Sequence, residues 1–221
     1  MSKKFNTVFF DLDGTLADTA PDLGGALNAL LIEHGRKPLS HEIIRPIASH
    51  GSPGLIKLGF GVTPQDPAYA ALRARFLEIY NGSLCKHTKL FPGVPEVLTE
   101  LGRRGIQWGV VTNKPAFLTE PLLKTLNPSP APACIVSGDS TANRKPHPEP
   151  MLFACKSAGC QPLDCVYVGD AERDIQAGRE AGMQTLVALF GYIGKDETPA
   201  NWGANGMIKT PHELLDWLDA Q

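Results

Sequence analysis

The stretch Phe9-Phe10-Asp11-Leu12-Asp13-Gly14-Thr15-Leu16 decides the fold of this chain. An apolar, strand-like run ends at two aspartates spaced two residues apart, and Gly14 then permits a sharp turn. A carboxylate at the end of a buried strand is poorly solvated and close to another acid, an arrangement that calls for a chemical reason. The pair predicts Asp11 as a nucleophile and Mg²⁺ ligand, and Asp13 as a general acid and base. The alternative is an Asp-Gly turn with two incidental acids.

Three later segments repeat this pattern of an apolar run followed by polar groups. One run leads into Thr112 and Asn113, a second precedes the loop that carries Lys145, and a third ends at Asp170, with Asp174 four residues further on. In open α/β sheets, ligands bind beyond the carboxyl ends of parallel strands. We therefore expect the four segments to meet in one crevice.

Together these segments resemble the four signature motifs of the haloacid dehalogenase superfamily of aspartate-nucleophile phosphatases. The motifs occur in the family's order, and the resemblance covers nearly the whole chain. It implies that Asp11 attacks phosphorus and forms an aspartyl phosphate, which water then hydrolyses with help from Asp13. The implied site residues are catalytic Asp11, Asp13 and Lys145, phosphate-binding Thr112 and Asn113, and Mg²⁺ ligands Asp11, Asp13 (through its backbone carbonyl), Asp170 and Asp174.

Charge considerations support a cation at this site. Two carboxylates about 5 Å apart repel each other by roughly 3 kcal/mol at an effective dielectric constant of 20. Four aspartates beside a phosphate dianion therefore need positive partners. Mg²⁺ suits an all-oxygen site that touches a substrate phosphate, and Lys145 would neutralise charge on the transferring phosphoryl group.

The periodicity of apolar residues predicts an α/β fold. Short, almost continuously apolar runs indicate strands buried on both faces; they lie at 7–10, 107–111, 134–136, 165–168 and 185–189. Helical patterns lie between the last four of these runs, at 116–126, 149–158 and 172–181. Another helical stripe precedes the strand at 107–111; it contains Val94, Val97, Leu98 and Leu101, and its helix is expected to end at Gly105. This alternation predicts a parallel Rossmann-like sheet with helices on both faces. A last helix is expected to begin with Thr210 as its N-cap and Glu213 completing a capping box.

One connection is far longer than an ordinary crossover. About ninety residues separate Asp13 from the strand near Gln107, and they contain helical stripes of apolar residues. We expect a helical cap domain at 18–88, inserted into a Rossmann-like catalytic core formed by 1–17 and 89–221. In the resembled superfamily such a cap closes over the active site. Asp18 and Thr19 are expected to cap its first helix.

Length and composition fit a soluble globular enzyme. The chain has 221 residues, 43 % hydrophobic and 20 % charged, with a formal net charge of −2, so we expect neither nucleic-acid nor membrane binding. Residues 1–4 lead into the first strand without a secretory signal pattern. Five cysteines without a CxxC pattern favour reduced thiols in the cytoplasm, and four of them lie in apolar surroundings and are interpreted as core residues. We expect a monomer or small homo-oligomer whose partner is a small-molecule phosphate monoester.

Other functions fit the motifs less well. A dehalogenase needs no proton donor for its leaving group, so Asp13 favours a phosphatase. Response-regulator receivers also use a phosphorylated aspartate, but they are much shorter and lack the insertion. A catalytically retired scaffold would not keep every motif residue. A phosphomutase, whose closed cap retains the phosphorylated intermediate, stays open as an alternative.

The substrate is left open between two resembled groups. The segments around Asp13 and Thr112 look most like phosphoglycolate phosphatases, whereas the segment 45–51 resembles phosphatases of N-acetylmuramic acid 6-phosphate. Within the cap, Arg45, Ser49 and His50 are the candidate substrate-binding residues. Arg45 could pair with a carboxylate, which both substrates carry. The alternative is that Arg45 is a surface helix residue.

Overall fold

A six-stranded parallel sheet forms the centre of the molecule, in the strand order β5-β4-β1-β6-β7-β8. The computed structural model describes residues 5–221, so residues 1–4 of the predicted core lie outside the described part. The strands are β1 (Thr7–Phe10), β4 (Gln107–Val111), β5 (Ile135–Val136), β6 (Cys165–Gly169), β7 (Gln184–Ala188) and β8 (Gly206–Ile208). The predicted parallel sheet is confirmed. The strand β8 was not predicted, because three residues carry too little periodicity.

The central strand β1 is buried on both faces. Val8 and Phe10 belong to the larger apolar cluster on one side of the sheet, and Phe9 belongs to a second cluster on the other side. This alternation explains why the run reads as continuously apolar. Phe10 pairs with Val110 of β4 and Val168 of β6, so the three strands end at the same level.

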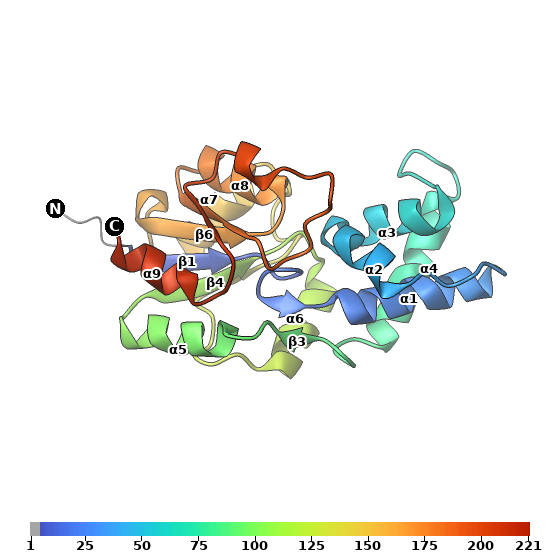
Figure 1. Ribbon diagram of the computed structural model, residues 1–221, viewed down its shortest axis with the longest axis horizontal. Coiled ribbons are helices and arrows are strands. Elements are labelled where there is room, and N and C mark those ends of the chain that lie inside the picture. Colours follow the sequence, from blue (N-terminus) through green and yellow to red (C-terminus); the bar gives the residue numbers. More distant parts are fainter. Residues whose placement is uncertain (1–4) are drawn as a thin grey trace.

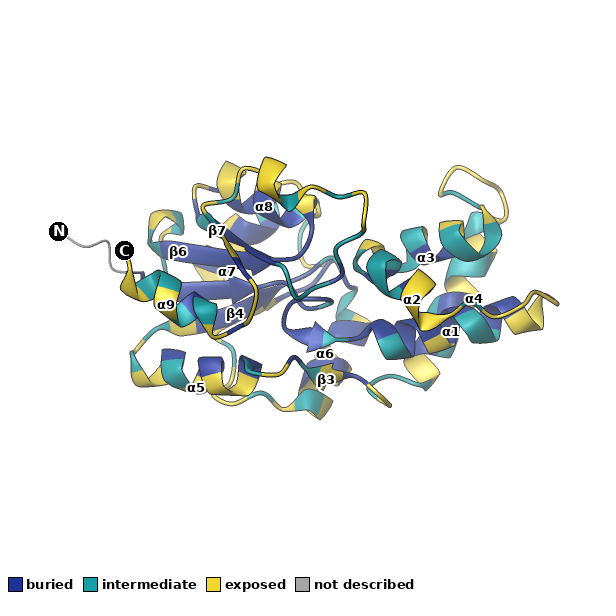
Figure 2. Ribbon diagram, viewed as in Figure 1, coloured by how far each residue is buried: buried dark blue, intermediate teal, exposed yellow. Residues whose placement is uncertain are grey.

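Helices cover both faces of the sheet, as Figure 1 shows. They are α5 (Val94–Arg103), α6 (Ala116–Leu126), α7 (Glu149–Ala158), α8 (Glu172–Glu180) and α9 (Glu213–Asp219). In Figure 2 the buried residues concentrate in the strands and on the helix faces turned toward them. The predicted helical crossovers are confirmed.

The long connection after β1 forms a separate helical layer beyond one end of the sheet (Figure 1). It comprises α1 (Ala20–Glu33), α2 (His41–Ile44), a 3₁₀ turn (Arg45–His50), α3 (Gly51–Phe60) and α4 (Tyr69–Gly82). We call residues 20–82 the helical insertion. Two short antiparallel strands, β2 (Ala17–Asp18) and β3 (Lys89–Leu90), join it to the rest of the chain. Helices α1 and α4 pack together through buried side chains such as Leu27 and Phe76.

Two predicted helix starts are wrong in detail. Thr19 occupies the N-cap position of α1, but its hydroxyl donates to Asp13 Oδ1 at 2.6 Å instead of capping the helix. Asp18 does not cap it either, because its carboxylate pairs with Arg45 at 2.8 Å. Helix α9 begins at Glu213 rather than after Thr210, since a hydrogen-bonded turn from Glu213 N to Thr210 O precedes it.

No helix within residues 5–221 has the length and apolar character needed to cross a membrane.

Candidate active site

The loop after β1 brings its two aspartates to the carboxyl end of the sheet. Asp11 N donates to Val168 O of the neighbouring strand at 2.9 Å, which extends the parallel pairing to the last residue of the run. Gly14 has a φ of +86°, and a Cβ at this position would collide with the Asp170 carboxylate. Only glycine therefore permits the turn that places Asp13 above the strand ends.

Three carboxylates meet at this edge. Asp11, Asp170 and Asp174 are all buried, and each contributes an oxygen to a group whose members lie within 4.8 Å of one another. The segment that carries Asp11 and the segment that carries Asp170 and Asp174 therefore meet in the structure, as the sequence predicts. We call these three residues the acid cluster.

Lys145 is the ammonium partner of the acid cluster. Its Nζ lies 2.9 Å from Asp11 Oδ1 and 2.8 Å from Asp174 Oδ1. It also donates to Val111 O at 3.0 Å and to Tyr167 Oη at 2.8 Å. The side chain is 1 % exposed, so these contacts form away from water and hold the ammonium in one place.

The acid cluster has more negative charge than its protein partners neutralise. Burial raises the pKa of Asp170 to about 7, and the nearby Asp11 and Asp174 carboxylates contribute to the shift. Burial likewise raises the pKa of Asp174, against the opposing effect of Lys145. Oxygen donors crowded together in a buried site fit a hard divalent cation, which removes this repulsion. The three carboxylates of the acid cluster could therefore hold a divalent metal ion.

Asp13 stands apart from the acid cluster and faces a different cation. Its Oδ1 accepts from Thr19 at 2.6 Å and lies 2.9 Å from Lys114 Nζ. Lys114 also contacts Tyr80 Oη at 2.9 Å, and Tyr80 belongs to α4 of the helical insertion. Burial opposes the charge on Lys114, but Asp13 and Tyr80 outweigh it and raise the pKa of the lysine.

The loop after β4 carries Thr112 and Asn113. Both line the cavity described below. The side chain of Asn113 accepts from Lys145 N at 3.0 Å and donates to Lys145 O at 2.9 Å. Asn113 thus holds the loop that carries Lys145, and its backbone rather than its amide is left to face a ligand.

One residue of the helical insertion reaches the acid cluster. Ser49 Oγ donates to Asp170 Oδ2 at 2.6 Å, and Arg173 Nη2 donates to Ser49 O at 2.5 Å. Arg173 is half-buried; burial opposes its charge, but the acid cluster raises its pKa overall. The insertion and the sheet are therefore joined directly at the site.

A cavity of about 1310 Å³ lies between the strand-end loops and the helical insertion. The predicted residues that line it are Asp11, Asp13, Thr112, Asn113, Ser49 and His50. Burial lowers the pKa of His50, and the neighbouring Arg173 adds to this effect. Arg45 is not part of the lining; it pairs with Asp18 and lies over the Tyr192 ring, 4.9 Å from its centroid.

The cavity wall also contains cations. Arg144 stands beside Lys145 on the loop that the sequence marked, whereas Lys57 of α3, Arg73 of α4 and Arg173 were not predicted. Arg173 could have been suspected from its place between Asp170 and Asp174. The positions of Lys57 and Arg73 depend on how the insertion packs, and no motif marks them.

Comparison with known proteins agrees with this geometry. Residues 8–188 match the family described as haloacid dehalogenase-like hydrolase. The chain belongs to the haloacid dehalogenase-like hydrolases. The prediction of family and of a hydrolase of the phosphatase type is thereby confirmed.

Relatives of two kinds are similar over nearly the full chain. An N-acetylmuramic acid 6-phosphate phosphatase of Pseudomonas putida is 38 % identical over 98 % of this chain and 97 % of its own length. A phosphoglycolate phosphatase of Xylella fastidiosa is 43 % identical over 94 % of this chain and 90 % of its own length. Among solved structures, one described as a predicted phosphoglycolate phosphatase from Haemophilus somnus superposes with a TM-score of 0.84, at 26 % identity, covering 96 % of this chain and 97 % of the other.

Proposed function

We propose that this hydrolase is a Mg²⁺-dependent phosphatase that cleaves a small phosphorylated metabolite through an aspartyl phosphate on Asp11. The observation that carries the proposal is that, within residues 5–221, only one oxygen of the Asp11 carboxylate is engaged by neighbouring protein groups. Among the described residues, two polar groups contact this carboxylate, both at Oδ1: Leu12 N donates to it at 2.7 Å and Lys145 Nζ lies 2.9 Å away. The carboxylate is thus held in one orientation while Oδ2 is left to attack.

The reaction proceeds in two displacements. In the first, Asp11 Oδ2 forms a bond to phosphorus, the ester P–O bond breaks, and Asp13 gives its proton to the leaving oxygen. In the second, Asp13 takes a proton from water, the water oxygen bonds to phosphorus, and the bond to Asp11 breaks. Inorganic phosphate leaves and Asp13 is again protonated.

Charge on the phosphoryl group is handled by the surrounding residues. Lys145 and Thr112, with the backbone of Asn113, would hold its oxygens. Mg²⁺, held by Asp11, Asp170, Asp174 and the Asp13 carbonyl, would neutralise the acid cluster and polarise the phosphoryl oxygens. The pairing of Lys145 with two of these carboxylates supports this division of roles.

The helical insertion is proposed to act as the cap of the active site. The hydrogen bond from Ser49 to Asp170 and the contact of Tyr80 with Lys114 support this role, because both join the insertion to residues at the strand ends. We keep the predicted division into a core of 1–17 and 89–221 and a cap of 18–88. Cap residues would then contact the leaving group of the substrate.

The proposed substrate is a phosphorylated carboxylic acid. The motifs favour phosphoglycolate, the substrate named for one group of relatives. The cavity favours the larger candidate, N-acetylmuramic acid 6-phosphate, named for the other. At about 1310 Å³ it exceeds even the typical volume of a site for a drug-sized ligand, so a two-carbon ester would leave most of it to water. Lys57 and Arg73, rather than Arg45, are the cap cations placed to meet the carboxylate.

A substrate panel tests the proposal. The purified enzyme with Mg²⁺ is assayed for inorganic phosphate release from N-acetylmuramic acid 6-phosphate, phosphoglycolate, hexose phosphates and an aryl phosphate, and kcat/KM is compared. We expect the first to be the best substrate and Asp11→Asn to release no phosphate from any. Turnover by Asp11→Asn would overturn the mechanism, whereas a preference for phosphoglycolate would overturn only the substrate argued from the cavity.

A further inference from the structure

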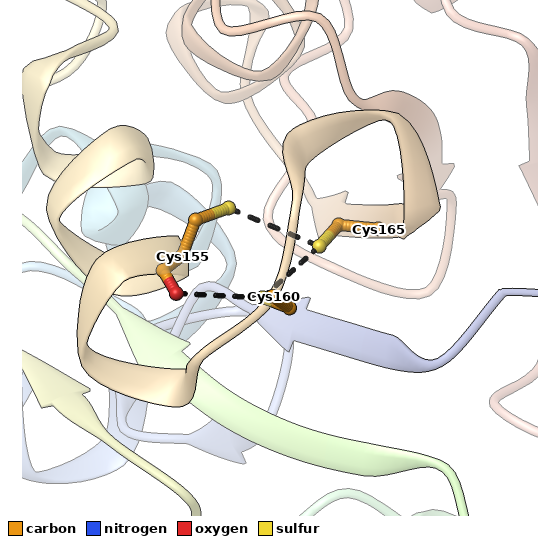
Figure 3. Close-up of side chains that lie close together, drawn as sticks. All are labelled: Cys155, Cys160 and Cys165. Atoms are coloured by element: carbon orange, nitrogen blue, oxygen red, sulfur yellow. Dashed lines mark hydrogen bonds between the residues drawn. The ribbon is translucent and has the colours of Figure 1, made fainter.

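Three cysteines gather on the connection between α7 and β6. Cys155 lies in the last turns of α7, Cys160 follows the end of that helix, and Cys165 begins β6. Gly159 ends the helix with a φ of +69°, and the chain then turns back so that Cys160 N donates to Cys155 O at 3.0 Å. A short 3₁₀ turn (Pro162–Asp164) returns the chain to the sheet. Figure 3 shows the three residues close together, with the Cys155 and Cys165 side chains pointing toward each other, and we call them the thiol cluster.

The sulfur atoms are as close as the ligands of one metal ion. Cys155 Sγ lies 3.8 Å from Cys165 Sγ, and Cys165 Sγ lies 3.4 Å from Cys160 Sγ. All three sulfurs lie within 4.8 Å of one another. A Zn–S bond of about 2.3 Å places two sulfurs of a tetrahedral site about 3.8 Å apart. The Cys155–Cys165 and Cys165–Cys160 distances thus lie within a few tenths of an ångström of this spacing, and the third pair, Cys155 and Cys160, lies within 4.8 Å.

We propose that the thiol cluster binds one thiophilic divalent cation, Zn²⁺, through three thiolates, with a fourth position open to water. Three sulfur donors select a soft cation over Mg²⁺, which prefers oxygen. Binding displaces a proton from each thiol, and Zn²⁺ offsets most of the resulting negative charge. Cys160 is partly exposed, which provides access for the ion and for a water ligand, whereas Cys155 and Cys165 are buried.

The thiols contact each other, which distinguishes them from ordinary core cysteines. Cys160 and Cys165 also donate to backbone carbonyls, as Cys134 does to Ala154 O at 3.7 Å, but Cys134 lies outside the group of sulfurs that are close to one another.

The proposed site is remote from the acid cluster. Cys165 pairs in register with Thr7 at the start of the strands, while Asp170 follows their carboxyl ends. The length of β6 separates the two sites by roughly 15 Å. Zn²⁺ here would tie α7 to the sheet and stabilise the fold without taking part in turnover, so the proposal is independent of the phosphatase mechanism.

Co²⁺, a spectroscopic substitute for Zn²⁺, provides the test. The full chain, reduced with a phosphine and saturated with Mg²⁺ at the carboxylates, is titrated with Co²⁺. We expect a near-ultraviolet thiolate-to-metal charge-transfer band that saturates at one Co²⁺ per chain and is abolished by Zn²⁺. Carboxylates give no such band, so binding at the acid cluster does not contribute.

Matched variants identify the ligands. Cys160→Ser, at a partly exposed position, is expected to lose the band, whereas Cys85→Ser, in a cysteine outside the cluster, should retain it. Independently, Zn²⁺ should slow alkylation of Cys155, Cys160 and Cys165 in the wild-type chain at least tenfold, as read by mass spectrometry of peptides. Absence of the band in wild type, an unchanged band in Cys160→Ser, or equal alkylation with and without Zn²⁺ would overturn the proposal. The alkylation experiment decides the matter even if the variant does not fold.

Discussion

Lys114 Nζ lies 2.9 Å from Asp13 Oδ1, in a contact that is almost closed to solvent on the lysine side. Tyr80 of the helical insertion completes the arrangement, with its hydroxyl 2.9 Å from the same ammonium. The proposed general acid is therefore oriented by a lysine that Tyr80 of the helical insertion holds in turn. This relationship links the packing of the insertion to the chemistry at the strand ends.

We expect Lys114→Met to lower kcat by about 10- to 100-fold, because the apolar side chain fills the space but leaves Asp13 without its orienting partner. Tyr80→Phe should have a smaller effect in the same direction. Steady-state kinetics measure both, with Lys124→Met as the control, since Lys124 is an exposed lysine on α6. Unchanged kcat in Lys114→Met would show that Asp13 needs no such partner.

Asp11→Asn is expected to lower turnover by at least about a thousandfold, because an amide cannot form the acyl phosphate. Asp13→Ala should slow both displacements and allow phosphoenzyme to accumulate if the second is slowed more. Acid-quenched protein analysed by mass spectrometry detects the added phosphoryl group. Circular dichroism spectra like those of wild type show that the fold is kept.

Mg²⁺ binding is expected to depend on pH through Asp170. Its pKa in the metal-free protein is raised to about 7 by burial and by Asp11 and Asp174, so a cation must displace a proton from it at lower pH. Affinity for Mg²⁺ should therefore fall about tenfold per pH unit below about 7 and level off above it. Calorimetric titration at several pH values measures this slope. Asp170→Asn should bind Mg²⁺ weakly, and its affinity should not show this dependence on pH.

The same shift has a consequence for stability. The folded metal-free chain keeps a proton on Asp170 that the unfolded chain, with an ordinary pKa of 3.8, has released. The free energy of unfolding should therefore decrease as pH rises from about 4 to about 7, as far as this group contributes. Mg²⁺ should reverse this loss. Denaturant unfolding with and without Mg²⁺ at both ends of this range measures the difference, and equal pH dependence in both series would contradict it.

The strand-end residues could be predicted because one geometric rule covers them. Parallel strands that end at the same level bring their following loops together, so Asp11, Asp170 and Lys145 were predictable from apolar runs and spacing. The strand order was not predicted from the sequence. The family resemblance then supplied the proposed roles.

Side-chain directions in the insertion could not be predicted in this way. Arg45 was a candidate ligand for a substrate carboxylate, yet its guanidinium pairs with Asp18. Thr19 stands at a helix start, but its hydroxyl donates to the nearby Asp13 carboxylate and does not cap the helix. Such choices depend on tertiary neighbours about which local sequence carries no information.

The cap cations provide the last prediction. Lys57 and Arg73 line the cavity from α3 and α4, and neither has an ion-pair partner within 4 Å among the described residues. We expect Lys57→Ala or Arg73→Ala to raise KM for a carboxylate-bearing phosphate ester about tenfold while changing KM for an aryl phosphate by less than about twofold, because only the former loses a charge partner.

Arg45→Ala is the matched control for the same measurement. Since Arg45 contacts Asp18 and the Tyr192 ring outside the cavity wall, its removal should affect both substrates equally, through the packing of the insertion. Arg45→Ala could instead raise KM selectively for the carboxylate ester, with no such rise in Lys57→Ala or Arg73→Ala. That result would show that Arg45 binds the substrate carboxylate. It would also require the Asp18 pair to open when substrate binds, because the guanidinium cannot serve both carboxylates in the arrangement described here.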